Sequence, residues 1–196
     1  MRTTARRHPA GPPAATVRPD PGGVGRSSSA AAERVSDDLR RGAGDFLEQR
    51  RRIAGLTSLA SFALGVVGLY QFGLLRRVPE PPLPFLDADA VDAAGEAYQQ
   101  FRTPDAALGL LSAGVTLALA GMGDRDRART APWVPLALAA KTAADAGGGI
   151  YLFAEQVTKH RKVCSWCTVA AAAQLATLPL ALPEARAALR RLVGRS

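Results

Sequence analysis

The sequence predicts an all-α membrane protein, a polytopic four-helix transmembrane bundle with a disordered N-terminal tail. Three observations support this fold class. Four long segments between residues 53 and 182 carry almost no charge, and arginines gather near their ends. None of the segments alternates apolar with polar residues, as a half-buried strand does. The mean hydropathy of +0.01 hides the pattern, because basic and apolar stretches are separated along the chain.

Residues 1–45 are predicted to be a disordered tail rich in Arg, Pro, Gly and Ser. Residues 1–52 hold 11 arginines and six acidic residues, with no apolar run to bury. Residues 30–52 allow two interpretations, a solvated stretch beside the membrane or a charged helix with pairs such as Asp37 and Arg41. The net charge of +8 is expected to orient a membrane protein, and nucleic acid is not expected as a partner.

Residues 46–185 are predicted to form the membrane domain. Its first segment, 53–75, is uncharged and, at about 1.5 Å per residue, crosses a hydrocarbon core of about 30 Å. The other predicted segments are 106–122, the stretch after Pro132 to about 153, and 164–182, which ends at Pro183. Residues 186–196 then form a basic C-terminal tail.

The distribution of Lys and Arg predicts a multi-pass protein of the cell membrane with both termini cytoplasmic. Arginines precede the first segment and follow the fourth, whereas the connection 76–105 carries six acidic residues and three arginines. Only the basic residues at 159–162 oppose this orientation, because they lie on the predicted outer side.

Lys141 and Asp145 lie four residues apart in the third segment. Charges at membrane depth are costly, so the two are expected to pair on one helix face. A structural ion pair is the favoured interpretation, and a proton path to a buried redox site is the alternative.

Cys164 and Cys167 are the candidate catalytic residues, in the sequence Cys-Ser-Trp-Cys at the outer mouth of the fourth segment. Cysteines at i and i+3 in a first helical turn share a face and can form a disulfide after slight distortion. The helix N-terminus and the basic residues 159–162 favour the thiolate. No metal site is predicted, because zinc takes about four ligands and His160 is the single histidine nearby. A structural pair that packs the helix end is the alternative.

Residues 52–182 resemble the vitamin K epoxide reductase family, including its bacterial homologues. The C-x-x-C that opens the last helix carries the resemblance, together with the order and spacing of the four helices. Residues 103–111, Thr-Pro-Asp-Ala-Ala-Leu-Gly-Leu-Leu, are similar to the family's Pro-Asn-x-x-x-Gly entry to its second helix.

The resemblance implies a membrane oxidoreductase that passes electrons between thiols and a quinone of the menaquinone or ubiquinone type. Cys167 would face the quinone, and Cys164 would exchange disulfides with an extracytoplasmic thioredoxin-like protein. Asp105 stands where the family has an asparagine that hydrogen-bonds a quinone oxygen. An ionised Asp cannot donate that bond and a protonated one can. A helix N-cap before Ala106 is the other interpretation of Asp105.

Two departures from the family pattern affect these expectations. The family commonly has a second cysteine pair in the loop after its first helix, and residues 76–105 contain no cysteine, so an internal relay is impossible. Ala171 stands where some members have a tyrosine that positions the quinone. Several glycines are expected either to pack helices closely or to leave room for a ring: Gly109, Gly114 and Gly147 to Gly149. The alternative function is a non-catalytic membrane scaffold or subunit with a structural C-x-x-C.

Overall fold

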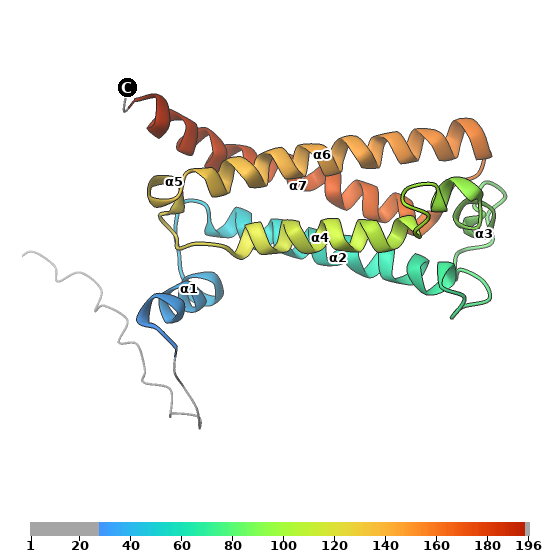
Figure 1. The fold of residues 1–196 in the computed structure, drawn as a ribbon, viewed down its shortest axis with the longest axis horizontal. Coiled ribbons are helices and arrows are strands. Elements are labelled where there is room, and N and C mark those ends of the chain that lie inside the picture. The colour runs from blue at the N-terminus through green and yellow to red at the C-terminus, as the bar shows by residue number, and fades with distance from the viewer. Residues whose placement is uncertain (1–27, 195–196) are drawn as a thin grey trace, which may run out of the picture.

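The computed structural model describes residues 28–194, and in this range it consists of helices and loops without a β-strand. Four long helices lie side by side (Figure 1): α2 (Leu47–Gln71), α4 (Asp105–Gly121), α6 (Trp133–Glu155) and α7 (Ser165–Val193). α2 packs between α4 and α7, and α6 packs along α7 and less extensively on α4. The predicted all-α class is therefore confirmed for the described residues.

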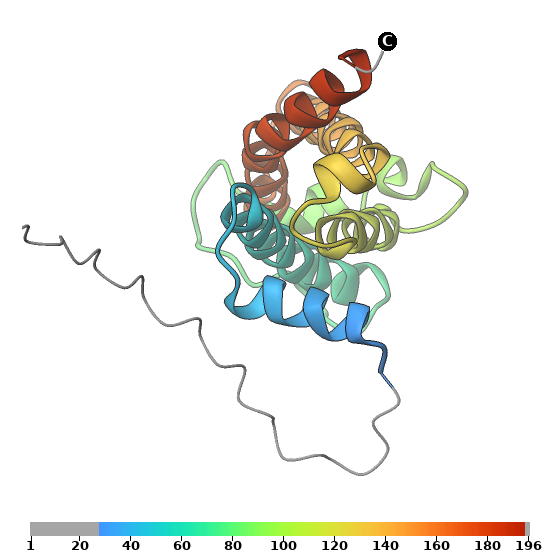
Figure 2. The same cartoon turned by 90° about the vertical axis from the view of Figure 1, so that its left-hand side faces the viewer.

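Short elements lie at the two ends of the long helices. They are α1 (Ala30–Arg41), α3 (Ala88–Asp92), the 3-10 turn η1 (Gly95–Tyr98), α5 (Arg127–Thr130) and the π-turn η2 (Gln156–His160). α1, α5 and the C-terminal end of α7 lie at one end of the molecule (Figure 1). α3 and the beginning of α7 lie at the other end, and α1 crosses beside the bundle in the end-on view (Figure 2).

Small residues fill the interior and many large apolar residues face outward. Alanines dominate the buried positions, among them Ala60, Ala63, Ala113, Ala120, Ala170 and Ala173. Exposed large side chains include Leu59, Phe62, Leu69, Leu111, Val115, Ile150, Val169 and Leu175. Helices that associate in lipid pack through small residues, because lipid tails solvate large apolar ones as well as a protein core does. The packing is therefore typical of membrane helices.

α2 and α7 are each long and apolar enough, by length and composition, to cross a membrane. α4 is apolar but has only 17 residues, below the usual length of about 20. α6 has 23 residues and carries Lys141 and Asp145 in its middle.

α2 covers residues 47–71, so the predicted segment 53–75 began and ended a few residues too late in the sequence. The helix extends back over three arginines because Arg50 is 2% exposed and donates to four carbonyl oxygens of residues 120–124, at the end of α4. Carbonyls at a helix end have no partner within their own helix, and Arg127 bonds two of the same four, those of Ala120 and Met122. The helix ends at Gln71, and two residues later Gly73, with a φ of +76°, allows the closing bonds from Gly73 N to Tyr70 O and from Leu74 N to Leu69 O.

α7 continues to Val193, so the predicted helix end at residue 182 was wrong. Pro179 and Pro183 lie inside the helix, where each removes one N–H donor. Glu184 follows directly and is 3% exposed, and its two carboxylate oxygens accept from Arg127 at 2.8 and 2.6 Å. This bidentate pair anchors the turn after Pro183. Residues 186–193 of the predicted C-terminal tail are consequently helical.

The predicted disorder over residues 1–45 does not hold for residues 30–41, which form α1. Ser29 caps the helix by accepting from Ala32 N, and Arg41 pairs with Asp37 at 3.3 Å. Arg51 donates to three carbonyl oxygens at the end of α1 and so attaches it to α2. The charged-helix interpretation is correct for this segment, although residues 42–46 interrupt the helix. Residues 1–27 of the tail lie outside the described residues.

We expect Arg127→Ala to lower the thermal stability of the detergent-solubilised protein strongly. The change leaves the buried Glu184 carboxylate without a partner, a loss of about 3–5 kcal/mol for buried pairs. Differential scanning fluorimetry measures it, with the exposed Arg129→Ala as the matched control. The double variant Arg127→Ala/Glu184→Ala should lose less stability than the sum of the two single variants, and strict additivity would contradict a coupled pair.

Candidate functional site

The loop between α2 and α4 folds over the beginning of α7. A short backbone bridge joins them, since Val163 N donates to Phe85 O at 3.0 Å and Asp87 N donates to Val163 O at 3.2 Å. The indole N–H of Trp166 donates to Pro79 O at 2.6 Å. The loop is therefore attached directly before Cys164 and again between the two cysteines.

Glu80 strengthens this attachment with both of its carboxylate oxygens. Oε1 accepts from Ala88 N, at the start of α3, at 2.5 Å. Oε2 accepts from Ser165 N at 3.3 Å and from Ser165 Oγ at 3.0 Å. Charge-assisted bonds of this kind are stronger than neutral ones. One side chain thus connects two parts of the loop to the residue that follows Cys164.

Both cysteines are free thiols, and Cys164 is fully buried while Cys167 is half-buried. Cys164 is the N-cap residue of α7, and its Sγ accepts from Cys167 N at 3.1 Å. Its own backbone N donates to Gln156 Oε1, on η2, at 3.0 Å. The predicted position of the pair at the start of the last helix is thus correct, and the positive helix end faces the Cys164 sulfur.

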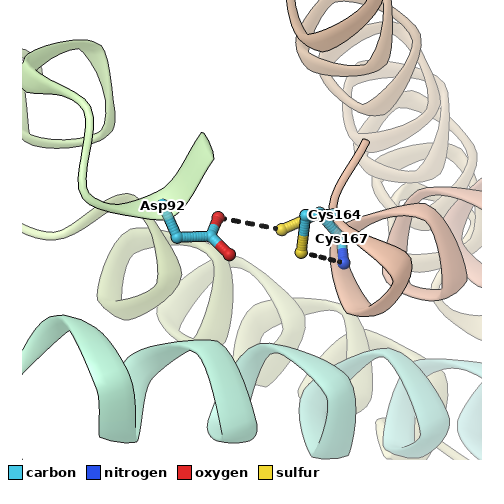
Figure 3. A group of neighbouring side chains, drawn as sticks. All are labelled: Asp92, Cys164 and Cys167. Carbon is cyan, nitrogen blue, oxygen red and sulfur yellow. Dashed lines mark hydrogen bonds between the residues drawn. The ribbon is translucent and has the colours of Figure 1, made fainter. Parts of the chain in front are cut away.

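Asp92, at the end of α3, points at the two sulfurs from the opposite side (Figure 3). Cys167 Sγ donates to Asp92 Oδ1 at 3.2 Å. Asp92 is 1% exposed, and its Oδ2 is buried without a hydrogen-bond partner. Burial raises the pKa of Asp92 from 3.8 to about 6, although hydrogen bonds from Cys164 and Cys167 act in the opposite direction.

The predicted basic surroundings of the cysteines are not what the structure shows. Lys159 pairs with Glu155, and Lys162 Nζ donates to Pro84 O at 2.9 Å. The charged group in contact with Cys167 is the carboxylate of Asp92 instead. The tertiary fold, in which the loop supplies an acid, therefore overrides the local charge of the sequence.

A cavity of about 120 Å³ lies beside Cys167, between α2, α4, α6 and α7. Asp92, Asp105 and His160 line it together with Cys167. The other lining residues are apolar or small side chains and four further polar ones, Glu96, Glu155, Gln156 and Gln174. The structure thus brings the predicted thiol and the predicted quinone contact to one cavity. Cys164 is not among the lining residues, so the two cysteines have different surroundings.

Asp105 is held in this cavity by Gln71, the last residue of α2. Gln71 Nε2 donates to Asp105 Oδ1 at 2.7 Å, and Gln71 Oε1 accepts from Ala106 N at 3.2 Å. Asp105 is the first residue of α4, the N-cap residue is Pro104, and no side chain at that position caps the helix. The N-cap interpretation of Asp105 is therefore wrong, because Gln71 from another helix satisfies the free N–H of Ala106.

Two of the predicted glycines lie at close helix contacts beside the cavity. A Cβ at Gly109 would come within 3.0 Å of Leu64, and a Cβ at Gly149 within 3.3 Å of Ala171 Cβ. Gly109, Gly149 and Ala171 all line the cavity. Gly114, Gly147 and Gly148 have open space at the Cβ position, so they make no close helix contact.

Lys141 and Asp145 form the predicted ion pair, with Nζ 2.6 Å from Oδ2. The pair also bonds Ser112 and Thr116 of α4, so it ties α6 to α4. This arrangement confirms the structural ion pair, and a proton path through it stays a prediction.

The donor atoms of Asp92, Cys164 and Cys167 lie within 4.8 Å of one another. A structural zinc site takes four protein ligands. Within residues 28–194 this group supplies three, so no four-ligand zinc set is present there.

Sequence analysis missed four residues of the site: Glu80, Asp92, Gln71 and Gln156. The two acids were counted only as loop charges that orient the chain in the membrane. The available signal was the density of acidic residues in a loop that faces a C-x-x-C, yet it does not tell which acid is buried. Each of the two glutamines forms hydrogen bonds to a residue of another element, and no local pattern indicates such a contact.

A comparison with protein families matches residues 52–182 to the model described as the Vitamin K epoxide reductase family. The matched range runs from α2 into α7 and contains every residue of the site described above. No curated protein and no solved structure gives a significant match.

We expect the stability difference between Asp92→Asn and the native protein to depend on pH. The pKa of Asp92 is about 6 in the folded protein and 3.8 in the reference state. The folded state therefore binds more protons between these values, and the free energy of unfolding falls as pH rises from about 4 to about 6. Above pH 6 the free energy of unfolding of the native protein should be lower than at pH 4 by on the order of 3 kcal/mol from this group, and Asp92→Asn should not show this decrease. Melting temperatures of both proteins measure this, and a difference independent of pH would contradict the shifted pKa.

Proposed function

This chain belongs to the vitamin K epoxide reductase family, and we propose that it is a membrane thiol–disulfide oxidoreductase that couples the Cys164–Cys167 pair to reduction of a quinone. One observation carries the proposal. Cys167 and Asp105 line the same cavity, whereas Cys164 lies outside that lining, beneath the loop. A pair of this kind can exchange disulfides with a protein thiol through one sulfur and react with a small molecule in the cavity through the other.

In the proposed mechanism Cys164 is the sulfur that a thioredoxin-like partner attacks. The Cys167 N–H that points at Cys164 Sγ, and the helix end behind it, stabilise negative charge on that sulfur. A second thiol of the partner then breaks the mixed disulfide, which leaves the partner oxidised and both Cys164 and Cys167 reduced, and Cys167 faces the cavity. A quinone of the menaquinone or ubiquinone type, bound there, supplies a two-electron acceptor. Asp105, fixed by Gln71, is the proposed contact for a quinone oxygen and can donate when it is protonated.

Access of the partner to Cys164 requires the loop to move. Cys164 has no exposed surface, and the loop bonds to Val163, Ser165 and Trp166 around it. The loop has no cysteine that could relay electrons, so the partner thiol must itself reach the Cys164 sulfur. We propose that breaking the bonds of Glu80 admits the partner.

The proposed location is the cell membrane, with several crossings and both termini cytoplasmic. The beginning of α2 and the end of α7 lie at the same end of the molecule, as an even number of crossings requires (Figure 1). The C-x-x-C then lies at the outer end, where disulfide chemistry is supported. The exposed apolar side chains described above would contact lipid.

A second candidate function is a membrane scaffold in which the C-x-x-C is structural. The complete burial of Cys164 and its position as the helix cap favour this candidate. It predicts that cysteine replacement disrupts folding, whereas the oxidoreductase predicts that replacement removes redox chemistry and leaves a folded protein.

We expect the pair in native membranes to be reduced by dithiol and to re-form its disulfide only when quinone is present. A mass shift after thiol blocking measures the redox state. Cys167→Ser should trap a thioredoxin-like protein as a mixed disulfide at Cys164, and Cys164→Ser should trap none. If the variants fold and the redox state of the cysteine pair does not change when quinone is added, the scaffold function would explain the protein better.

Glu80→Gln should speed alkylation of Cys164 by about tenfold in a Cys167→Ser background. The change removes charge-assisted bonds worth about 1.5–3 kcal/mol each from the closed loop. Glu96→Gln is the matched control, since it removes the same charge from an exposed position of the same loop. Equal alkylation rates in the two variants would show that Glu80 does not hold the loop closed.

A further inference from the structure

Asp92 has an unusual environment for a carboxylate. Its side chain is almost fully buried, and one oxygen accepts from the Cys167 thiol while the other has no partner. A buried polar atom without a hydrogen bond costs about 1–3 kcal/mol. Such a cost is commonly found where an atom has a chemical task.

The charges around Asp92 do not explain its burial. Among residues 28–194 no Lys, Arg or His forms an ion pair with it. The titratable groups that act on it are the thiols of Cys164 and Cys167 from α7, the carboxylate of Asp105 from α4 and that of Glu80 from the loop. Glu96 and His160 line the same cavity. A buried carboxylate paired with a cation would be structural, and this one contacts a thiol instead.

We propose that Asp92 is a catalytic residue that accepts the proton of the Cys167 thiol and returns it. This inference rests on the proposed thiol–disulfide function and adds a residue to it. Asp92 is in direct contact with the reacting sulfur, and the contact already has the thiol as donor and the carboxylate as acceptor (Figure 3).

The proton transfer balances with disulfide exchange in both directions. When Cys167 resolves a mixed disulfide at Cys164, its S–H bond breaks and the proton forms an O–H bond with Asp92. The sulfur electron pair forms the Cys164–Cys167 bond, and the bond to the partner breaks with its electron pair on the partner's sulfur. In the reverse direction the partner thiolate attacks Cys164, and Asp92 returns the proton to Cys167 as the disulfide opens.

The acidity of Asp92 suits this role. Its pKa of about 6 lies close to neutral pH, where a general base is most effective, and burial is the main cause. An ordinary aspartate would be a much weaker base. The positive helix end stabilises a thiolate but cannot accept its proton. The loop provides the buried Asp92 carboxylate as the proton acceptor.

The test is the rate of the resolving step in the full-length protein in detergent, without quinone. Reduced protein is mixed with dithiobis(nitrobenzoate), and release of the second thionitrobenzoate, at a rate independent of reagent concentration, reports attack by Cys167. We expect Asp92→Asn to slow this step about 100-fold near pH 7. The ratio of the two rates should fall steadily as the pH is raised, because hydroxide then removes the thiol proton without help from Asp92.

Asp87→Asn is the matched control, because it removes the same charge from the same short helix and asparagine caps a helix as well as aspartate does. It should resolve at the native rate. A ratio that falls as the pH is raised shows that Asp92→Asn is folded and has its cysteines in place. An Asp92→Asn rate equal to the native rate at neutral pH, or a rate reduced by the same factor at every pH, would overturn the proposal.

Failure of the proposed function gives a different result. If the native protein releases no second thionitrobenzoate at any pH, Cys167 does not resolve, and both the oxidoreductase and the role of Asp92 are wrong. If the native protein resolves normally but its disulfide ignores quinone, only the quinone coupling fails and the assignment of Asp92 stands.

Discussion

The structure of the site depends on the attachment of the α2–α4 loop to the beginning of α7. Glu80 bonds to Ala88 and Ser165, and the bridge at Val163 fixes the same region from the other side. These bonds place α3 above the cysteines and so bury Asp92 against Cys167. Without them Cys164 would be open to solvent and the cavity beside Cys167 would lose one wall. A loop without cysteines thus still sets the surroundings of the pair, because it brings the Asp92 carboxylate into contact with Cys167.

The two ends of the molecule solve the same physical problem in different ways. Helix ends leave backbone groups without partners, and in a lipid environment water does not supply them. At one end two buried arginines, Arg50 and Arg127, donate to the free carbonyls of α4, and Glu184 balances Arg127. At the other end Gln71 and Gln156 serve the beginnings of α4 and α7. The first end is closed by buried arginines and an ion pair, whereas at the second end two neutral amides act together with the Glu80 carboxylate beside the cavity.

The interior made of small residues also shapes the site. Because alanines and glycines line the helix contacts, α6 and α7 approach closely at Gly149 and Ala171, and the cavity forms where the packing opens beside them. A larger residue at Ala171 would occupy this space. Asp105 and Cys167 face the same cavity from different helices, so their relation depends on helix packing and not on the short motifs that first marked them.

Local sequence patterns were enough to predict that the chain is helical, where α4 and α6 lie to within a few residues, the Lys141–Asp145 pair, and the position of the C-x-x-C at the start of α7. Each of these follows from a local pattern: the length of an apolar segment, a four-residue spacing, or a motif at the start of a helix. Four features depend on contacts between distant segments: α2 begins at Leu47, α7 continues past Pro183, Gln71 rather than Asp105 bonds the start of α4, and Asp92 contacts Cys167. The physical reason is that a buried charge or polar group is stable only when a partner, often distant in the sequence, satisfies it. Residues 34 to 75 positions apart make these contacts, and no local pattern records such partners.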